Sequence, residues 1–320
     1  MKAVRCQNGR VLVQEVARPE GPGVRVRIAS AGICGSDLHL VAGAFPMAHT
    51  LGHEFAGTLA DGTAVAIEPI APCGECIPCQ RDDYHLCTLG PSMIFGMARD
   101  GGMAEEVLVP EATLVRLAPG LAARDACLVE PLAVAIHGLR QAGVGPDTRV
   151  AIVGAGSIGL SAVAATVAMG ARPRLLARHD FQRAAGERLG ADIAENDDAD
   201  CDVVVDAAGS SSALEAAVNL SRPGGLLLLL GTYWDGFDAP IFPICLREIR
   251  ILPSSMYNRG PAGRDVEVAA RMLAENPEIA RTLISHRLPL EAAAEAFELA
   301  RDRTRGAIKV VLEPGAAAAS

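Results

Sequence analysis

The sequence has no excess of basic residues and no apolar start. Lys and Arg total 29 against 38 Asp and Glu, which gives a formal net charge of −9. An acidic protein is a poor partner for nucleic acid or for an anionic membrane surface. Residues 1–5, Met-Lys-Ala-Val-Arg, lack the apolar run of a secretory signal peptide. We therefore expect a cytoplasmic protein that binds neither nucleic acid nor membrane.

A long uninterrupted apolar span is also missing. Residues 150–171 contain no charged side chain, but glycine, serine and threonine interrupt them, at Gly154, Gly156, Ser157, Gly159, Ser161, Thr166 and Gly170. A transmembrane helix needs about 20 predominantly apolar residues. A strand followed by a buried helix fits this pattern better than a membrane span.

The nine cysteines are not spread as a disulfide framework would be. Four of them follow the spacing C-x2-C-x2-C-x7-C, at Cys73, Cys76, Cys79 and Cys87. In a reducing compartment such clustering points to metal rather than to disulfides. Four thiolates close a tetrahedral zinc site and leave no position for a substrate. The spacing therefore predicts a structural zinc that holds a loop together.

The chain changes character near Glu130. Before Glu130 the sequence predicts short β-strands separated by Gly and Pro, whereas after it predicted helices and strands alternate. The predicted helices are 131–141, 157–169, 180–189, 211–220 and 265–275, and the predicted strands are 150–153, 175–177, 202–205 and 226–230. Short apolar strands between helices are typical of a parallel sheet covered on both faces. The tail adds a helix at 291–301 and a strand at 307–312.

A glycine-rich turn follows the predicted strand 150–153. It has the form G-x-G-x-x-G, with Gly154, Gly156, Ser157, Ile158 and Gly159 leading into the next helix. The first glycine permits a tight turn, the second lets a pyrophosphate approach, and the third lets helix and sheet pack closely. The phosphate would lie on the free N–H groups at the helix start. This context predicts a dinucleotide-binding site.

The end of the second predicted strand indicates which dinucleotide is bound. An NAD site usually places an acid there to bind the ribose hydroxyls. This chain has Arg178 and His179 instead, with Arg183 five positions after Arg178. An arginine can bind a 2′-phosphate through two parallel hydrogen bonds. We expect NADP(H) to be preferred over NAD(H); in the alternative, Arg178 is a solvated surface residue and Asp180 binds the ribose.

A second set of metal-ligand residues is dispersed along the chain. Cys34 opens the run Cys-Gly-Ser-Asp-Leu-His, His53 and Glu54 are adjacent, and Glu130 comes much later. Mixed sulfur, nitrogen and oxygen ligands are expected of a zinc that keeps one position for substrate. Taken singly, each of these residues is a weak signal.

The order of these motifs resembles that of the zinc-dependent medium-chain alcohol dehydrogenases, with the closest likeness to the branch of sorbitol, threonine and related polyol dehydrogenases. The resemblance covers nearly the whole chain. It rests on the four-cysteine segment, the glycine turn and the runs CGSDLH at 34–39, GHEFAG at 52–57, GGMAE at 101–105, VEPLA at 129–133, ISHRLPL at 284–290 and AIKVV at 307–311.

The resemblance implies an α/β fold of two domains. A GroES-like, β-rich catalytic domain would comprise residues 1–130 and be completed by 281–320. A Rossmann domain, with a doubly wound parallel sheet, would comprise 131–280. The family forms oligomers, so a homodimer or homotetramer is expected.

The resemblance also assigns roles to individual residues. Cys34, His53 and Glu54 would bind the catalytic zinc, and Glu130 would be either a fourth ligand or the partner of the zinc-bound water. Ser36 would begin a proton relay with His39 further out, while Asp37 would orient His53. The complete list of expected site residues is Cys34, Ser36, His39, His53, Glu54 and Glu130, the four cysteines, and Gly154, Gly156, Ser157, Ile158, Gly159, Arg178, His179 and Arg183.

The function expected from these features is reversible oxidation of a secondary alcohol, a polyol or a related polar hydroxyl compound, to its ketone. Zinc would act as a Lewis acid and NADP(H) would exchange the hydride. Three alternatives remain: the same reaction with NAD(H), a zinc-free quinone or enone reductase of the same fold, and a non-catalytic zinc-binding module. Two zinc ions per chain favour the enzyme and one favours the module. Trp234, the only tryptophan, follows Tyr233 after a predicted strand and is a candidate to line the cleft.

Overall fold

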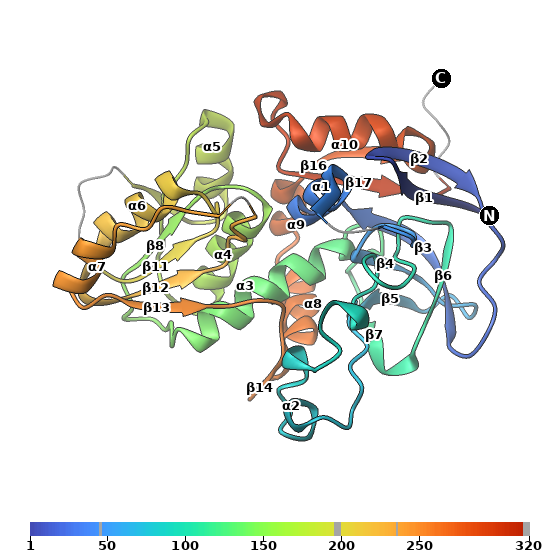
Figure 1. Cartoon of the computed structure of the whole chain (residues 1–320), viewed down its shortest axis with the longest axis horizontal. Helices are drawn as coiled ribbons and strands as arrows, with labels where there is room; N and C mark the ends of the chain where they lie inside the picture. The colour runs from blue at the N-terminus through green and yellow to red at the C-terminus, as the bar shows by residue number, and fades with distance from the viewer. Residues whose placement is uncertain (45–46, 195–199, 235, 316–320) are drawn as a thin grey trace. The chain divides into compact units, whose positions relative to one another are not determined.

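The computed structural model describes residues 1–44, 47–194, 200–234 and 236–315. The chain divides into two compact units. The first contains Met1–Glu130, Asn258–Ala280 and Ile284–Ser320, and the second contains Pro131–Tyr257 and Arg281–Leu283. Figure 1 shows the elements of both units along the chain.

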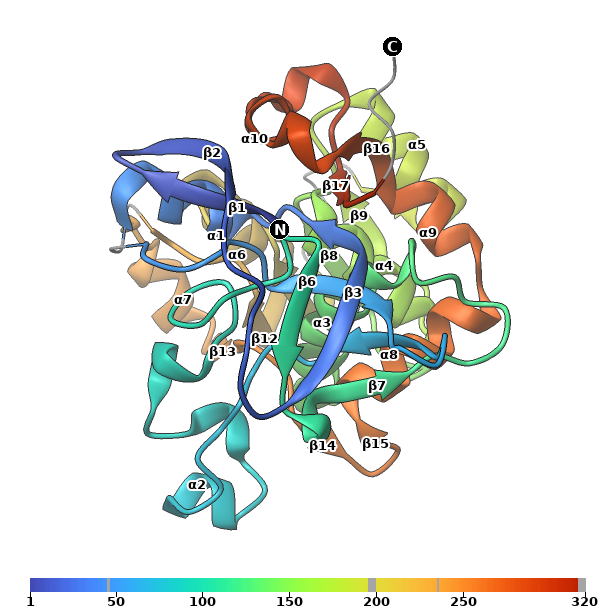
Figure 2. The same cartoon turned by 90° about the vertical axis from the view of Figure 1, so that its right-hand side faces the viewer.

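A seven-stranded sheet forms the centre of the first unit. Its order is β16-β17-β3-β4-β5-β7, and β6 also pairs with β3, beside which it lies in Figure 2. The strands are β3 (Val24–Gly32), β4 (Glu54–Thr58), β5 (Ala64–Ile67), β6 (Glu106–Val109), β7 (Leu114–Arg116), β16 (Ile284–Pro289) and β17 (Lys309–Glu313). β17 pairs with β3 through Val311 and Gly32, so the end of the chain completes the sheet that the first residues begin.

Shorter elements surround this sheet. β1 (Lys2–Gln7) and β2 (Arg10–Glu15) form a hairpin, as do β14 (Arg259–Gly260) and β15 (Gly263–Arg264). The helices are α1 (Gly35–His39), α2 (Ile77–Gln80), α8 (Asp265–Glu275), α9 (Glu278–Leu283) and α10 (Ala293–Arg301). Phe55 and Phe297 lie in one core with Val26, Ile28 and Met103. This arrangement agrees with the β-rich GroES-like unit expected from the sequence.

The second unit is a six-stranded parallel sheet in the order β10-β9-β8-β11-β12-β13. The strands are β8 (Val150–Val153), β9 (Arg174–Leu176), β10 (Asp192–Ile193), β11 (Cys201–Asp206), β12 (Ser221–Leu229) and β13 (Arg250–Pro253). The helices are α4 (Ser157–Ala168), α5 (Asp180–Arg188), α6 (Ser211–Leu220), α7 (Ile241–Leu246) and α3 (Val129–Gln141), whose first two residues belong to the first unit. This strand order is that of a doubly wound Rossmann sheet, which confirms the predicted fold class.

Residues 258–280 group with the first unit, whereas the sequence placed them in the nucleotide-binding domain. The reason is visible at Arg264, at the start of α8. Its guanidinium donates to the Glu68 carboxylate at 2.8 Å and to the carbonyls of Ala112 and Leu114 at 2.8 and 3.0 Å. These partners lie around β5 and β7, so long-range hydrogen bonds hold this segment to the first sheet.

The uncharged stretch 150–171 forms β8 and α4, as predicted. Among the described residues, no helix combines the length and the apolar character required to cross a bilayer.

Candidate metal centres and nucleotide-binding turn

The dispersed metal-ligand residues come together in the first unit. The Cys34 sulfur, a ring nitrogen of His53 and a carboxylate oxygen of Glu54 all lie within 4.8 Å of one another. Sheet register produces this cluster, because Gly32 at the end of β3 pairs with Glu54 at the start of β4. A Cβ on Gly32 would lie 2.2 Å from a Glu54 carboxylate oxygen, so a larger residue there would displace the Glu54 side chain. His53 and Glu54 are buried.

Asp37 connects two members of this cluster. One of its carboxylate oxygens accepts a hydrogen bond from the Cys34 N–H at 2.9 Å, and the other lies 3.4 Å from His53 Nδ1. The Ser36 hydroxyl lies 3.3 Å from the other ring nitrogen, Nε2. Burial alone would lower the pKa of His53, but the charges of Asp37 and Cys34 outweigh it and raise that pKa well above its usual value.

The donor set fits zinc. Thiolate, imidazole and carboxylate are the usual protein ligands of this metal. Asp37 Oδ1 and His53 Nδ1 are both buried without a hydrogen bond of good geometry. A carboxylate that faces an imidazole in this way commonly orients a histidine that binds metal. Cys34, His53 and one of the nearby carboxylates would hold the ion.

Glu54 has a partner that sequence reasoning missed. Lys309 Nζ donates to both Glu54 carboxylate oxygens, at 2.7 and 2.5 Å, and to the Ile33 carbonyl at 3.0 Å. Burial opposes the charge on Lys309, but the Glu54 carboxylate outweighs it and raises the pKa of the lysine. The sequence did hold a sign of this pair, because Lys309 is the only charged residue of the predicted strand 307–312. Lysine is almost never fully buried unless it is paired.

Glu130 and His39 complete the expected set. Glu130 is buried in the first turn of α3, and burial raises its pKa to about 7, against the opposing effect of the nearby His53. It is not among the three residues whose ligand atoms lie within 4.8 Å of one another. His39 is the half-buried last residue of α1, the helix that carries Ser36 and Asp37.

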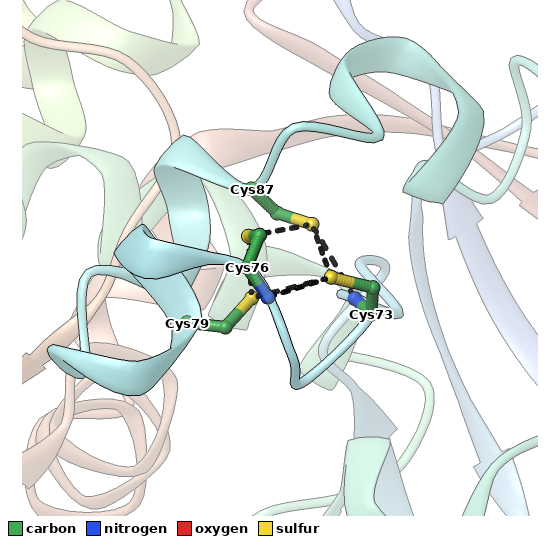
Figure 3. Close-up of side chains that lie close together, drawn as sticks. All are labelled: Cys73, Cys76, Cys79 and Cys87. Atoms are coloured by element: carbon green, nitrogen blue, oxygen red, sulfur yellow. Dashed lines mark hydrogen bonds between the residues drawn. The ribbon is translucent and has the colours of Figure 1, made fainter.

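The four cysteines of the predicted structural site also converge (Figure 3). The sulfur-to-sulfur distances are 3.4 Å for Cys76–Cys79, 3.5 Å for Cys73–Cys87, 3.8 Å for Cys76–Cys87 and 3.9 Å for Cys73–Cys79. A tetrahedral zinc with bonds of ~2.3 Å to sulfur places its sulfurs about 3.8 Å apart. Hydrogen bonds from the backbone N–H groups of Thr88 and Cys79 lower the pKa of the Cys76 thiol to about 6, whereas burial and the neighbouring thiols raise the pKa of Cys79 to about 12.

The glycine turn has the geometry that the motif predicts. Gly154 has φ of +98°, and a Cβ there would lie 2.9 Å from Ala208 Cβ. A Cβ on Gly159 would lie 1.8 Å from the Gly154 carbonyl oxygen. α4 begins at Ser157, after Gly156 in extended conformation, and no side chain caps its first N–H groups. The helix start is therefore open to a phosphate.

The predicted ribose-side residues follow β9. Arg178 is exposed just beyond the strand, and His179 precedes α5 with its ring stacked on Phe181. Arg183 already has partners, since it donates to the Ala177 carbonyl at 3.2 Å and lies 3.5 Å from Asp180. The Arg183 guanidinium is therefore already engaged by neighbouring residues.

Comparison with known proteins agrees with this geometry. The family model for the alcohol dehydrogenase GroES-like domain matches residues 21–119, and that for zinc-binding dehydrogenases matches residues 157–275. A galactitol 1-phosphate 5-dehydrogenase from Escherichia coli K12 is 32% identical, with 97% of this chain and 99% of the relative covered.

Two solved structures have the same fold over 98% of this chain and 99% of theirs. One is a zinc-binding dehydrogenase from Sinorhizobium meliloti bound to NADP, with 30% identity and a TM-score of 0.85. The other, from Escherichia coli, is described as a short chain alcohol dehydrogenase in complex with NADH, with 25% identity and a TM-score of 0.85. The protein is therefore an oxidoreductase that belongs to the zinc-dependent medium-chain alcohol dehydrogenase family.

Proposed function

We propose that the protein interconverts a polyol, or a related polar secondary alcohol, and its ketone by hydride transfer with NADP(H). The observation that carries this proposal is the convergence of Cys34, His53 and Glu54, with Glu130 and Ser36 near the same histidine. The relative that is named galactitol 1-phosphate 5-dehydrogenase supports a polyol as the substrate class.

Cys34 and His53 would hold the catalytic zinc, and the remaining protein ligand would come from Glu54 or Glu130. When bound, zinc supplies a Lewis acid that lowers the pKa of a hydroxyl toward neutrality. The Ser36 hydroxyl would accept the proton that leaves the alcohol, and its distance of 3.3 Å from His53 Nε2 supports a place beside the metal ligands. His39, three residues further along α1, would pass this proton outward.

The four cysteines would hold a second, structural zinc, so the proposal calls for two ions per chain. A closed set of four thiolates serves folding and leaves no position for substrate. The alternative of a non-catalytic zinc module needs only this site. Metal analysis separates the two functions, because the enzyme requires two zinc ions and the module requires one.

Arg178 supports NADP(H) as the preferred cofactor. It is exposed just beyond β9, where an NAD enzyme usually carries an acid. The similar structures bind NADP in one case and NADH in the other, so the preference rests on this residue.

Exposed apolar side chains support a homodimer or homotetramer. Ile241, Phe242 and Leu246 of α7 are 58%, 77% and 71% exposed. β13 is the edge strand of the second sheet, and its Ile251 is also exposed. An apolar edge of this kind is usually covered by another chain. Phe242→Glu should lower the mass of the particle measured by light scattering.

A substrate panel tests the proposal. Sugar alcohols, their phosphates and simple secondary alcohols are offered with NADP⁺ and then with NAD⁺, and formation of the reduced cofactor is followed by absorbance. Turnover of a polyol, faster with NADP⁺, is expected. A zinc-loaded protein that binds neither dinucleotide and oxidises no alcohol would contradict the proposed activity.

A further inference from the structure

Three turns meet at the carboxyl edge of the parallel sheet. The Ala207 N–H donates to the Val153 carbonyl at 2.9 Å, which joins the end of β11 to the end of β8. On the other side, a Cβ on Gly231 would lie 2.3 Å from the Gly209 nitrogen. The turn that follows β11 therefore lies between the turns that follow β8 and β12 and contacts both of them.

Asp206, the last residue of β11, fixes two of these turns. It is fully buried. Its main-chain oxygen accepts from the N–H groups of Leu230 and Gly231, at 2.9 and 2.8 Å. Its side-chain Oδ1 accepts from the N–H groups of Ala208 and Gly209, at 2.8 and 3.2 Å.

The second carboxylate oxygen of Asp206 accepts a hydrogen bond from the Tyr233 hydroxyl. Burial and the Asp206 charge both raise the pKa of Tyr233, which favours the protonated hydroxyl that donates this bond. A buried carboxylate is costly unless its oxygens are all bonded, and the tyrosine satisfies the last of them. The turn after β12 is thus held to β11 by a side chain as well as by the sheet.

The position of this turn relative to the nucleotide follows from the strand order. A dinucleotide lies across the point where the order reverses, between β8 and β11, with its pyrophosphate on the glycine turn. Arg178 follows β9 on one side of that point. If the adenosine half meets Arg178, the nicotinamide half would extend the other way, over the ends of β11 and β12, where Asp206 and Tyr233 lie.

We propose that Tyr233 is a positioning residue, which through its hydrogen bond to Asp206 holds the turn after β12 in the shape that receives the nicotinamide ring. This inference rests on the proposed dinucleotide-dependent activity. Trp234 is the next residue and the only tryptophan of the chain, so it serves as a built-in reporter of an occupied nicotinamide site.

The experiment uses Tyr233→Phe, which removes one hydroxyl and keeps the ring that packs on Phe237 at a centroid distance of 4.6 Å. Dissociation constants for NADPH and NADH are measured by energy transfer from Trp234. Loss of a hydrogen bond to a charged group should raise both constants, and the KM for cofactor, about tenfold. Fragments without nicotinamide, ADP-ribose and its 2′-phosphate, should compete as well against the variant as against the wild type.

Two further variants sharpen the result. Asp206→Asn keeps an oxygen for the Ala208 and Gly209 N–H groups and can donate to the Tyr233 oxygen, so it should bind within about threefold of the wild type. Tyr84→Phe removes a comparable hydroxyl, which donates to Glu68 at 2.7 Å in the first unit, and should leave the dissociation constants for cofactor unchanged.

An unchanged dissociation constant in Tyr233→Phe would overturn the inference while leaving the proposed activity standing. Equal losses for the whole dinucleotide and for ADP-ribose would also overturn it, because that result describes a general loosening of the second unit. A wild type that binds neither NADPH nor NADH would overturn both the inference and the activity on which it rests.

Discussion

Lys309 and Glu54 form a buried ion pair between positions 255 residues apart in the chain. Glu54 begins β4 and Lys309 begins β17, and both strands pair with β3. The same ammonium also bonds the carbonyl of Ile33, the residue before Cys34. The end of the chain therefore sets the position of two segments that carry candidate zinc ligands.

Lys309→Met should destabilise the first unit and weaken its hold on the catalytic zinc. Removing one partner of a buried ion pair leaves an uncompensated charge and costs about 3–5 kcal/mol. Thermal unfolding with and without chelator, together with zinc analysis, measures both effects. Lys2→Met is the matched control, because Lys2 pairs with Glu291 at 2.6 Å on an exposed surface and its loss should matter far less. Equal unfolding temperatures in the two variants would show that the buried pair has no special role.

Cys34→Ala and Cys76→Ala should have opposite consequences. In the proposed function, Cys34 is a ligand of the zinc that keeps a position for substrate, so its loss should abolish turnover and leave the fold nearly intact. Cys76 belongs to the closed four-cysteine site, so its loss should chiefly lower thermal stability. Activity, unfolding temperature and zinc content are measured on both variants. Near-normal turnover in Cys34→Ala would remove that residue from the active site.

Local patterns carried most of the sequence prediction. The glycine turn occupies residues 154–159 and the four-cysteine segment residues 73–87, so the spacing within each motif largely fixes its geometry. The alternation of short strands and helices likewise predicted the parallel sheet. In the two motifs the interacting residues are near one another along the chain, and each strand or helix is recognised from its own residues.

The dispersed set Cys34, His53 and Glu54 was expected only through the family resemblance, and other long-range pairs were not predicted at all. The bond between Lys309 and Glu54 depends on β17 inserting beside β3, which no spacing reveals. The bond between Tyr233 and Asp206 depends on the register of β11 against β12. Residues 258–280 continue the chain after the parallel sheet, yet the hydrogen bonds of Arg264 tie them to the first unit. These features appear only when the strands are assembled.

Asp202 should make the second unit sensitive to acid. Its carboxylate accepts from Arg149 Nε at 3.1 Å and from Arg222 Nε at 2.7 Å, and these bonds hold its pKa well below the usual value. Because the pKa of Asp202 is lower in the folded state than in the unfolded state, its ionised carboxylate stabilises the fold. This stabilisation is present above the unfolded-state pKa, near 3.8, and is lost as the pH falls below that value.

Asp202→Asn should therefore lose about 1 kcal/mol at neutral pH, the size of a partly exposed ion pair. The difference in unfolding free energy between the variant and the wild type should shrink as the pH falls below about 4. Urea unfolding at a series of pH values measures this difference. The control is Asp192→Asn, at a more exposed pair with Arg172, where little change is expected at any pH. A difference that stays constant down to the lowest pH would contradict the assignment.

Arg178→Asp should reverse the cofactor preference. In the wild type, the exposed Arg178 can pair with a 2′-phosphate, and a hydrogen bond to a charged group is worth roughly 1.5–3 kcal/mol. Its loss should weaken NADP(H) about 10- to 150-fold at 1.4 kcal/mol per decade. The new carboxylate repels the phosphate and accepts from the ribose hydroxyls, so NAD(H) should gain. The measurement is kcat/KM for both cofactors.

The control is Arg188→Asp, at an exposed arginine in the last turn of α5, which should leave the ratio of the two kcat/KM values unchanged. If the wild type prefers NAD(H), or the ratio is the same in Arg178→Asp, then Arg178 is a solvated surface residue and the ribose is held elsewhere.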